Sequence, residues 1–268
     1  MRLINFLFFI IIISFLTACI GNDDVSGKAL INIYLVDAPG DFDEAWIAIE
    51  GVEVLMENEN GPENWIPLEY IPTQDRINVS DLIAGSALIM GRTELDTGTI
   101  AAIKLVFGKN HFLVKDGKNI ELNPENPNLQ EIIIEAAYSL DGGISHDLFL
   151  DFDLDASIRA LPEGEGFTLN PKISFFSSDN MAAISGRVTP VAAQPVLYAI
   201  IGTDTVSTYT NNQGNYLFRG LQEGNYNLYI APRPPYQDSL LMDVPTTLGM
   251  NTQIETITLE EPTDEEAE

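Results

Sequence analysis

Apolar and polar residues alternate with a period of two along most of this chain. The segment Ala29–Val36 is apolar and β-branched, and it ends at the turn sequence of residues 37–40. This period places successive side chains on opposite faces of a strand, whereas a helix would repeat every 3.6 residues. Only Ser80–Met90 has room for a short helix or a helical turn. The pattern therefore predicts an all-β protein with few short helices.

One segment changes phase within this alternation. In Trp46–Leu55, Ile47 and Ile49 share one face, whereas Val52 and Val54 fall on the other. One extra residue at the glycine between these pairs is typical of a β-bulge. We therefore expect a single bulged strand here.

Turn sequences separate the remaining strand candidates. Asp116-Gly117 supplies the positive φ angles that a tight hairpin needs. The other candidates of the first part are Thr99–Phe107, Phe112–Val114, Asn119–Leu122, Leu129–Tyr138, Ser145–Leu154 and Gly166–Phe176. Beyond the polar residues 177–180 they are Ala183–Val188, Val196–Ile201, Thr205–Thr210, Asn215–Arg219, Asn225–Ala231 and Gln253–Leu259.

Strands at intervals of about 8–12 residues, with turns between them, are typical of small sandwiches. We expect two β-sandwich-like domains, at residues 28–178 and 183–260. Residues 261–268 form an acidic tail that is too polar to fold.

The first 18 residues have the pattern of a secretory signal peptide. A basic start precedes the apolar run Leu3–Phe15, which is shorter than the roughly 20 residues that a membrane span needs. The sequence Leu16-Thr17-Ala18-Cys19 resembles the lipobox that lipoprotein signal peptidase cleaves before its cysteine. An ordinary signal peptide that happens to contain a cysteine is the alternative. We expect acylation of Cys19, and residues 19–27 would then tether the body to a membrane.

Charge narrows the range of partners. The chain has 13 Lys and Arg against 40 Asp and Glu, a formal net charge of −27. So acidic a protein lacks the basic surface that nucleic acids require, so we expect no nucleic-acid partner. The lipid anchor would make the membrane contact. Cys19 is the single cysteine, so its acylation leaves no disulfide.

The first unit has an L-x-D-A-P-x-D opening at residues 35–41, then Val52-Glu53-Val54, residues 150–153 and the closing residues 169–173. In these motifs it resembles a bacterial family of domains of unknown function that is common in envelope lipoproteins. It implies an all-β fold and secretion, and it implies no activity.

The second unit resembles the carboxypeptidase-regulatory-like modules, which are prealbumin-type or starch-binding-like sandwiches. The matching segments are residues 184–188, 210–218, 220–221 and 224–226, whereas the usual G-A-x-V is Ala193-Gln194-Pro195-Val196 here. That departure leaves one strand boundary open. Such modules are usually spacers or adhesive domains, and some relatives bind sugars.

Residues suited to catalysis are few. The two histidines are His111 and His146, and a surface or loop position is the alternative to a catalytic or zinc role for each. The chain contains no H-E-x-x-H, no G-x-G-x-x-G and no G-K-[ST] motif. The sequence therefore implies no cofactor, with calcium as the one possible ligand ion.

Two groups of carboxylates are calcium candidates. Asp151, Asp153 and Asp155 would share one face of a strand, and a cation would relieve their repulsion. The alternative is a solvated outer face. Asp37, Asp41 and Asp43, followed by Glu44, form a second group in a loop. For Asp37 the alternative is a turn cap that bonds nearby N–H groups.

Tyrosines of the second unit offer a possible sugar platform. Tyr216 and Tyr226 fall on core positions of the resembled module. Tyr209, Tyr229 and Tyr236 are less constrained and could stack on a glycan, with ordinary packing as the alternative.

The sequence favours a non-catalytic, lipid-anchored envelope protein with a binding, adhesion or assembly role. A carbohydrate-binding component of a surface glycan-uptake system is the alternative, and a carboxylate-based hydrolase is the third possibility. Ile20 after the cysteine favours the outer membrane, and Asn22-Asp23-Asp24 resembles signals for surface export. We therefore expect a surface-exposed outer-membrane lipoprotein whose partner is a glycan or an envelope protein.

Overall fold

Strands dominate the structure, a computed structural model that describes residues 27–38, 42–57, 64–83, 85–162 and 166–261. Cys19 and Asp41 lie outside these residues. The helices described are the four-residue α2 (Leu154–Ser157) and the short 3-10 helices η1 (Val79–Asp81) and η3 (Val191–Ala193). The predicted all-β class is confirmed.

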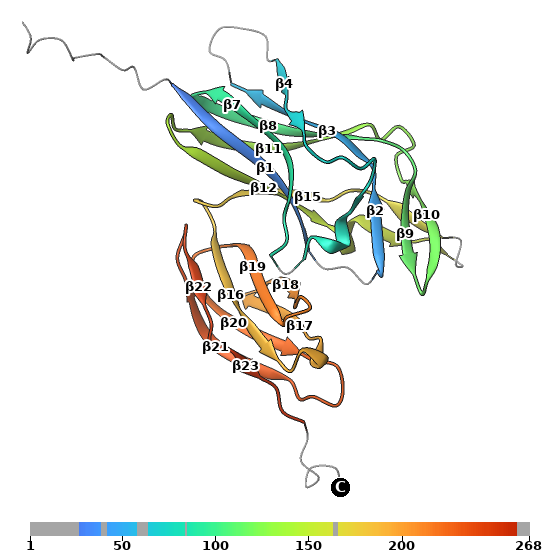
Figure 1. The fold of residues 1–268 in the computed structure, drawn as a ribbon, viewed down its shortest axis with the longest axis vertical. Helices are drawn as coiled ribbons and strands as arrows, with labels where there is room; N and C mark the ends of the chain where they lie inside the picture. The colour runs from blue at the N-terminus through green and yellow to red at the C-terminus, as the bar shows by residue number, and fades with distance from the viewer. Residues whose placement is uncertain (1–26, 39–41, 58–63, 84, 163–165, 262–268) are drawn as a thin grey trace, which may run out of the picture.

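Three sheets form the part of the chain before residue 178, and two form the part after residue 181 (Figure 1). Sheet 1 consists, in order, of β15 (Ile173–Ser177), β12 (Ser145–Asp153), β1 (Lys28–Ala38), β7 (Leu88–Asp96) and β5 (Glu69–Tyr70). Sheet 2 consists, in order, of β13 (Ile158–Ala160), β14 (Phe167–Leu169), β10 (Lys118–Pro124), β9 (His111–Lys115), β2 (Glu44–Ile47) and β6 (Ile77–Asn78). Sheet 3 consists, in order, of β11 (Glu131–Leu140), β8 (Gly98–Phe107), β3 (Ile49–Met56) and β4 (Trp65–Pro67).

The second unit consists of two four-stranded sheets. In sheet 4, β19 (Asn215–Leu221), β16 (Ala182–Thr189) and β22 (Asn251–Gln253) are neighbours, and β23 (Ile257–Thr258) also pairs with β16. Sheet 5 consists, in order, of β18 (Asp204–Tyr209), β17 (Val196–Ile201), β20 (Gly224–Ala231) and β21 (Ser239–Thr246). The sequence missed β21 in this unit, and β4 to β7 and β13 in the first.

Each unit has its own hydrophobic core. Alternate residues of β1, such as Ile31 and Ile33, are fully buried against Ile103 of β8 and Leu113 of β9, so one core joins sheets 1 to 3. A second core lies between sheets 4 and 5 and includes the predicted core residue Tyr216. Burying a large apolar side chain contributes about 1.5–3 kcal/mol, so these alternating faces supply most of the driving force.

The expected single strand Trp46–Leu55 is instead two strands, because the chain crosses from sheet 2 to sheet 3 at Ala48. The Ala48 N–H donates to Nδ1 of His111 at 3.0 Å, and the Ala48 carbonyl accepts from the Gly108 N–H at 3.0 Å. A register shift between Ile49 and Gly51 adds the bulge. The predicted bulge is therefore present, but the predicted continuity is wrong.

The segment Gly166–Phe176 is likewise two strands, β14 in sheet 2 and β15 in sheet 1. Asn170-Pro171 separates them, and proline cannot donate to a sheet ladder. The β9–β10 hairpin is confirmed, because Asp116 and Gly117 have φ angles of 52° and 68°.

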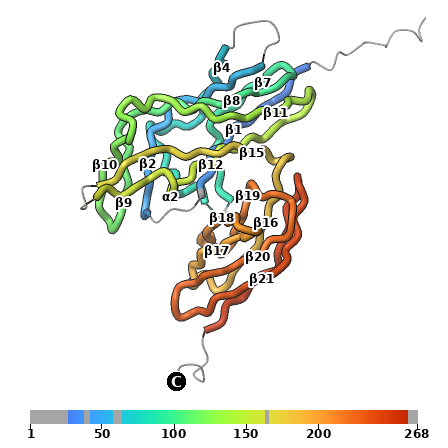
Figure 2. The backbone as a smooth tube through the Cα atoms, turned by 180° about the vertical axis from the view of Figure 1, so that it is seen from behind, coloured from blue at the N-terminus to red at the C-terminus, as the bar shows by residue number. Residues whose placement is uncertain are grey.

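The second unit packs beneath the outer face of sheet 1, as the front and rear views agree (Figures 1 and 2). Three rings stack across that face: Phe149 of β12 lies between Tyr34 of β1, at 5.3 Å, and Phe176 of β15, at 5.1 Å. Arg219 of β19 places its guanidinium 5.5 Å from the Phe149 ring centroid. This cation–π contact joins the two units.

Candidate functional site

The structure separates the members of each predicted carboxylate group and brings others together. β12 ends at Asp153, whose carboxylate caps α2 by accepting from the Ala156 N–H at 2.8 Å, and Asp155 lies within that helix. Asp155 therefore does not share a strand face with Asp151, because the strand has already ended. Asp37, from the other group, lies on β1 beside them.

Parallel pairing of β1 with β12 explains this meeting. Val36 pairs with Asp151, Asp37 with Phe152 and Ala38 with Asp153. Asp37 therefore lies between the two carboxylates along the register, with its side chain on the other face of the sheet. Asp37 and Asp151 line one cavity of about 40 Å³ at the junction of the units. Ser207, Thr208 and Arg219 line the same cavity from the second unit.

The Asp37 carboxyl group is in an unusual environment. Both of its oxygens are buried without a hydrogen-bond partner of normal geometry. Burial raises the pKa of Asp37 well above its usual value, the charges of Asp151 and Asp153 raise it further, and the Leu154 amide opposes the shift. The alternative role of Asp37 was a turn cap that bonds nearby N–H groups, and here the Leu154 amide approaches its carboxylate without a hydrogen bond of normal geometry.

The rest of the second carboxylate group lies elsewhere. Asp43 is exposed and accepts from the Gly117 N–H at 3.2 Å, and Glu44 accepts from Nε1 of Trp46 at 2.6 Å. Within the described parts of the chain, no three His, Cys, Asp or Glu side chains are grouped so that they could hold a metal ion. Calcium binding by either predicted group stays a prediction.

Both histidines are buried, so the alternative of a surface or loop position is wrong for each. His111 accepts from Ala48 through Nδ1, and burial followed by the charge of Arg76 lowers its pKa. His146 bonds Tyr138 through Nδ1 at 2.8 Å and the Asp141 carbonyl through Nε2 at 3.0 Å. Each imidazole therefore holds strands together.

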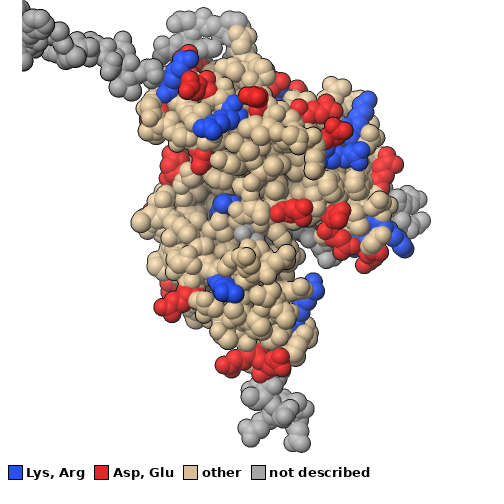
Figure 3. Space-filling model, viewed as in Figure 1, with Lys and Arg blue, Asp and Glu red and all other residues tan. Residues whose placement is uncertain are grey.

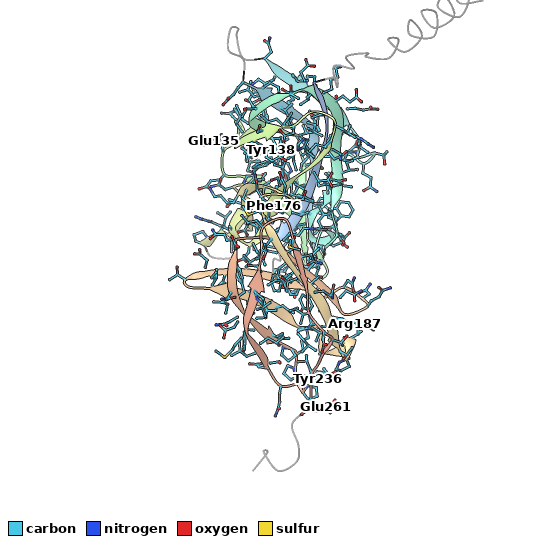
Figure 4. The ribbon with its side chains drawn as sticks, turned by 90° about the vertical axis from the view of Figure 1, so that its left-hand side faces the viewer. Glu135, Tyr138, Phe176, Arg187, Tyr236 and Glu261 are labelled. Carbon is cyan, nitrogen blue, oxygen red and sulfur yellow. The ribbon has the colours of Figure 1, made fainter. Side chains whose placement is uncertain are left out.

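The three candidate tyrosines do not form one platform. Tyr229 stacks on Tyr198 with ring centroids 6.1 Å apart and donates its hydroxyl to Asp238. Tyr209 is the last residue of β18 and pairs with Val196 of β17. Tyr236 packs against the second core at the end of the unit far from Phe176 (Figure 4).

A groove in the first unit is the feature that the sequence did not reveal. It encloses about 460 Å³ between β2, η1 and the start of β7. Trp46 forms one wall, stacked on Phe112 with centroids 5.9 Å apart, and the Arg76 guanidinium lies 5.5 Å from the Phe112 centroid. The aromatic character of Trp46 was the available signal, but its partner Phe112 reaches it only through β2–β9 pairing.

Polar residues line this groove, namely Thr73, Gln74, Arg76, Asn78 and Asp81. Oδ1 of Asn78 accepts from the Ala45 N–H at 3.1 Å and from the Ser80 hydroxyl at 3.0 Å. These bonds fix the amide, and no described residue accepts from its Nδ2. No described carboxylate lies within ion-pair distance of Arg76 either. The groove therefore offers donors that a ligand could use.

Acidic side chains are spread over the face drawn in Figure 3 rather than gathered in one patch. Among the described residues, no helix is long and apolar enough to cross a membrane.

Comparison with solved structures gives only weak likenesses, and no curated protein sequence matches. The minor pilin GBS52 of Streptococcus agalactiae is 13% identical, with 87% of this chain and 97% of that chain covered and a TM-score of 0.23. A fimbrial protein from Bacteroides ovatus is 8% identical, with 88% and 51% covered and a TM-score of 0.29. A cohesin–X-dockerin complex from Acetivibrio cellulolyticus is 18% identical, with a TM-score of 0.25 and with 30% of this chain and 57% of that chain covered.

The chain thus spans less than two thirds of that cohesin–dockerin chain. A family model gives the firmer assignment, because it matches residues 28–171, more than half of the chain. This range contains the carboxylates at the junction and the Trp46 groove. The chain belongs to the family described as Domain of unknown function (DUF4382).

Proposed function

We propose that this protein is a non-catalytic lipoprotein of the outer membrane that binds saccharides in the Trp46 groove. The observation that carries the proposal is that an aromatic wall and several polar residues line one groove of about 460 Å³. Ligand sites combine apolar walls with a few placed polar groups in this way. An indole face suits the C–H face of a sugar ring.

The polar lining favours sugar hydroxyls over other ligands. Arg76 donates only, Asp81 accepts only, and Gln74 does both, whereas a hydroxyl group can donate to one residue and accept from another. The net charge of −27 disfavours polyanionic ligands such as nucleic acids. The resemblance of the second unit to modules with sugar-binding relatives agrees with this ligand class.

The environments of the titratable groups support a binding role rather than catalysis. Both histidines are occupied by bonds within the fold. A carboxylate-based hydrolase needs an acid whose pKa is raised. Asp37 has that property, and it lines the junction cavity and not the groove.

The proposed location rests on the N-terminal sequence. The lipobox-like residues 16–19 support acylation of Cys19, and residues 20–24 support surface display on the outer membrane. The body would then meet extracellular glycans directly. Protease treatment of intact cells tests this location: digestion of the body is expected, and full protection behind a sealed outer membrane would contradict surface display.

A glycan array with the full-length protein in detergent tests the ligand. We expect binding to a subset of polysaccharides, with at least a tenfold loss in Trp46→Ala, because the stacking wall is removed. Trp65→Ala is the matched control. Trp65 is the other tryptophan, lies on β4 away from the groove, and has the Lys104 ammonium group over its ring. Silence across plant, animal and microbial glycans, or an equal loss in both variants, would overturn the proposal.

A further inference from the structure

Sheet 5 turns one face to the second core and presents apolar side chains on the other. Leu197 and Leu228 are fully buried in that core, so the residues that alternate with them lie on the outer face. The strand register places Tyr198, Tyr229 and Leu240 in one row across three neighbouring strands of this face. Its apolar members are Val196, Tyr198, Ile200, Tyr229, Leu240 and Met242.

This outer face is exposed and carries no charge at its paired positions. Those positions hold no Lys, Arg, Asp or Glu along the described strands of sheet 5, and Asp243 lies at the margin, in the bulge of β21. Leu240 and Met242 are nevertheless 57% and 65% exposed. The corresponding face of sheet 3, by contrast, carries the ion pair of Lys104 with Glu53. On a chain with a net charge of −27, an exposed apolar face without charges indicates an interaction surface.

The edge of sheet 5 is closed to a partner that would extend the sheet. β21 is an edge strand, and its bulge residue Asp243 has a φ angle of 57°. Pro245 has no N–H to donate, and its carbonyl accepts from the Thr252 hydroxyl at 2.7 Å. Bulges and prolines at an edge prevent the addition of another strand. A partner would therefore lie on the face of the sheet.

We propose that the outer face of sheet 5 binds a second copy of this chain, so that two copies associate face to face about a two-fold axis. Each copy carries a net charge of −27, and like charges brought together at an interface cost several kcal/mol. Contact through an uncharged face avoids that cost. A two-fold interface uses the same patch on both copies, so an uncharged patch always meets another uncharged patch.

The composition and order of the face suit such an interface. Tyrosine and methionine are enriched at the cores of protein interfaces, and here they are Tyr198, Tyr229 and Met242. The rings of Tyr198 and Tyr229 stack with centroids 6.1 Å apart, and the Tyr229 hydroxyl is held by Asp238. Side chains that are already ordered lose less entropy on association.

The size of the face implies a weak dimer. Four strands spaced by about 4.8 Å, each of about six residues with a rise of about 3.3 Å, give a face of roughly 15–20 Å in each direction. Such an area falls at the low end of specific interfaces, below about 1,200 Å² of total buried surface. We therefore expect association in the micromolar range of protein concentration.

Light scattering of the full-length protein in detergent, with the detergent mass subtracted, tests the proposal over a range of protein concentrations. The wild type should change from one to two chains of 29.5 kDa per particle as the concentration rises. Leu240→Asp and Met242→Asp should each raise the dissociation constant at least tenfold, because each places a carboxylate on both sides of the interface.

Ile133→Asp is the matched control, because Ile133 is 54% exposed on β11 of the first unit and Leu240 is 57% exposed. This variant should associate as the wild type does. An unchanged Tm at low protein concentration shows that all three variants fold, as expected for exposed positions.

Three results would overturn the proposal. One is a wild type that stays a single chain at every concentration. Another is association that Leu240→Asp and Met242→Asp leave unchanged, since the contact would then lie in the anchor or elsewhere. The third is an equal loss of association in Ile133→Asp. None of them bears on glycan binding, because the Trp46 groove lies in the first unit.

Discussion

Tyr138 connects three segments through one hydroxyl group. It bonds Nδ1 of His146 at 2.8 Å and donates to Asp179 at 3.0 Å. Tyr138 and His146 are both buried, so Tyr138→Phe leaves a ring nitrogen without a partner. We expect the free energy of unfolding to fall by about 1–3 kcal/mol in urea titrations. Tyr229→Phe, at an exposed bond to Asp238, should change it by less than about 0.5 kcal/mol. Equal effects would contradict the role assigned to Tyr138.

At the residue scale, the carboxylates of the junction could be predicted from the sequence, but their arrangement could not. Asp37 and Asp151 were both candidates, yet in separate groups, because only the parallel pairing of β1 with β12 brings them together. Periodicity placed Asp155 with Asp151, and the short helix that Asp153 caps removes it. Trp46 and Phe112 became neighbours in the same way, through strand pairing that no local pattern specifies.

At the scale of elements, His111 holds the corner where β2 leaves sheet 2 and β3 enters sheet 3. Its neutral ring accepts from the Ala48 N–H, and burial and Arg76 lower its pKa. A group with a lowered pKa in the fold stabilises it above about pH 6.5, and this contribution is lost as the pH falls through the folded pKa. Urea midpoints of the wild type should therefore decrease between pH 7 and pH 5. His111→Asn keeps an acceptor that does not titrate, so its decrease should be smaller. Parallel pH profiles for the two proteins would contradict this account.

Alternation predicted elements well where one face is buried and the turn is explicit, as in the β9–β10 hairpin at Asp116-Gly117. It failed where a strand changes partners. At Ala48 and Asn170 the chain passes from one sheet to another within a single alternating segment, so a local period cannot distinguish the crossing from one continuous strand. In β21 the bulge at Asp243 and the presence of Pro245 obscured the alternation.

For the whole molecule, two separate cores meet through a small aromatic contact. Contacts between domains that bury little surface permit relative motion, so the Arg219–Phe149 pair should determine how firmly the units are held together. Such a contact contributes about 0.5–2 kcal/mol. Arg219→Ala should loosen the junction without unfolding either core, because both cores exclude Arg219.

Small-angle scattering and limited proteolysis test this coupling. We expect Arg219→Ala to have a larger radius of gyration and faster cleavage within residues 178–181, since a freer junction exposes the connecting segment. Arg187→Ala is the matched control: its Nε donates to the Gln213 carbonyl at 3.1 Å, and it lies toward the end of the second unit away from Phe176 (Figure 4). If the two variants give the same scattering and cleavage as the wild type, another contact holds the units, and the stacked rings of sheet 1 serve only the packing of the first unit.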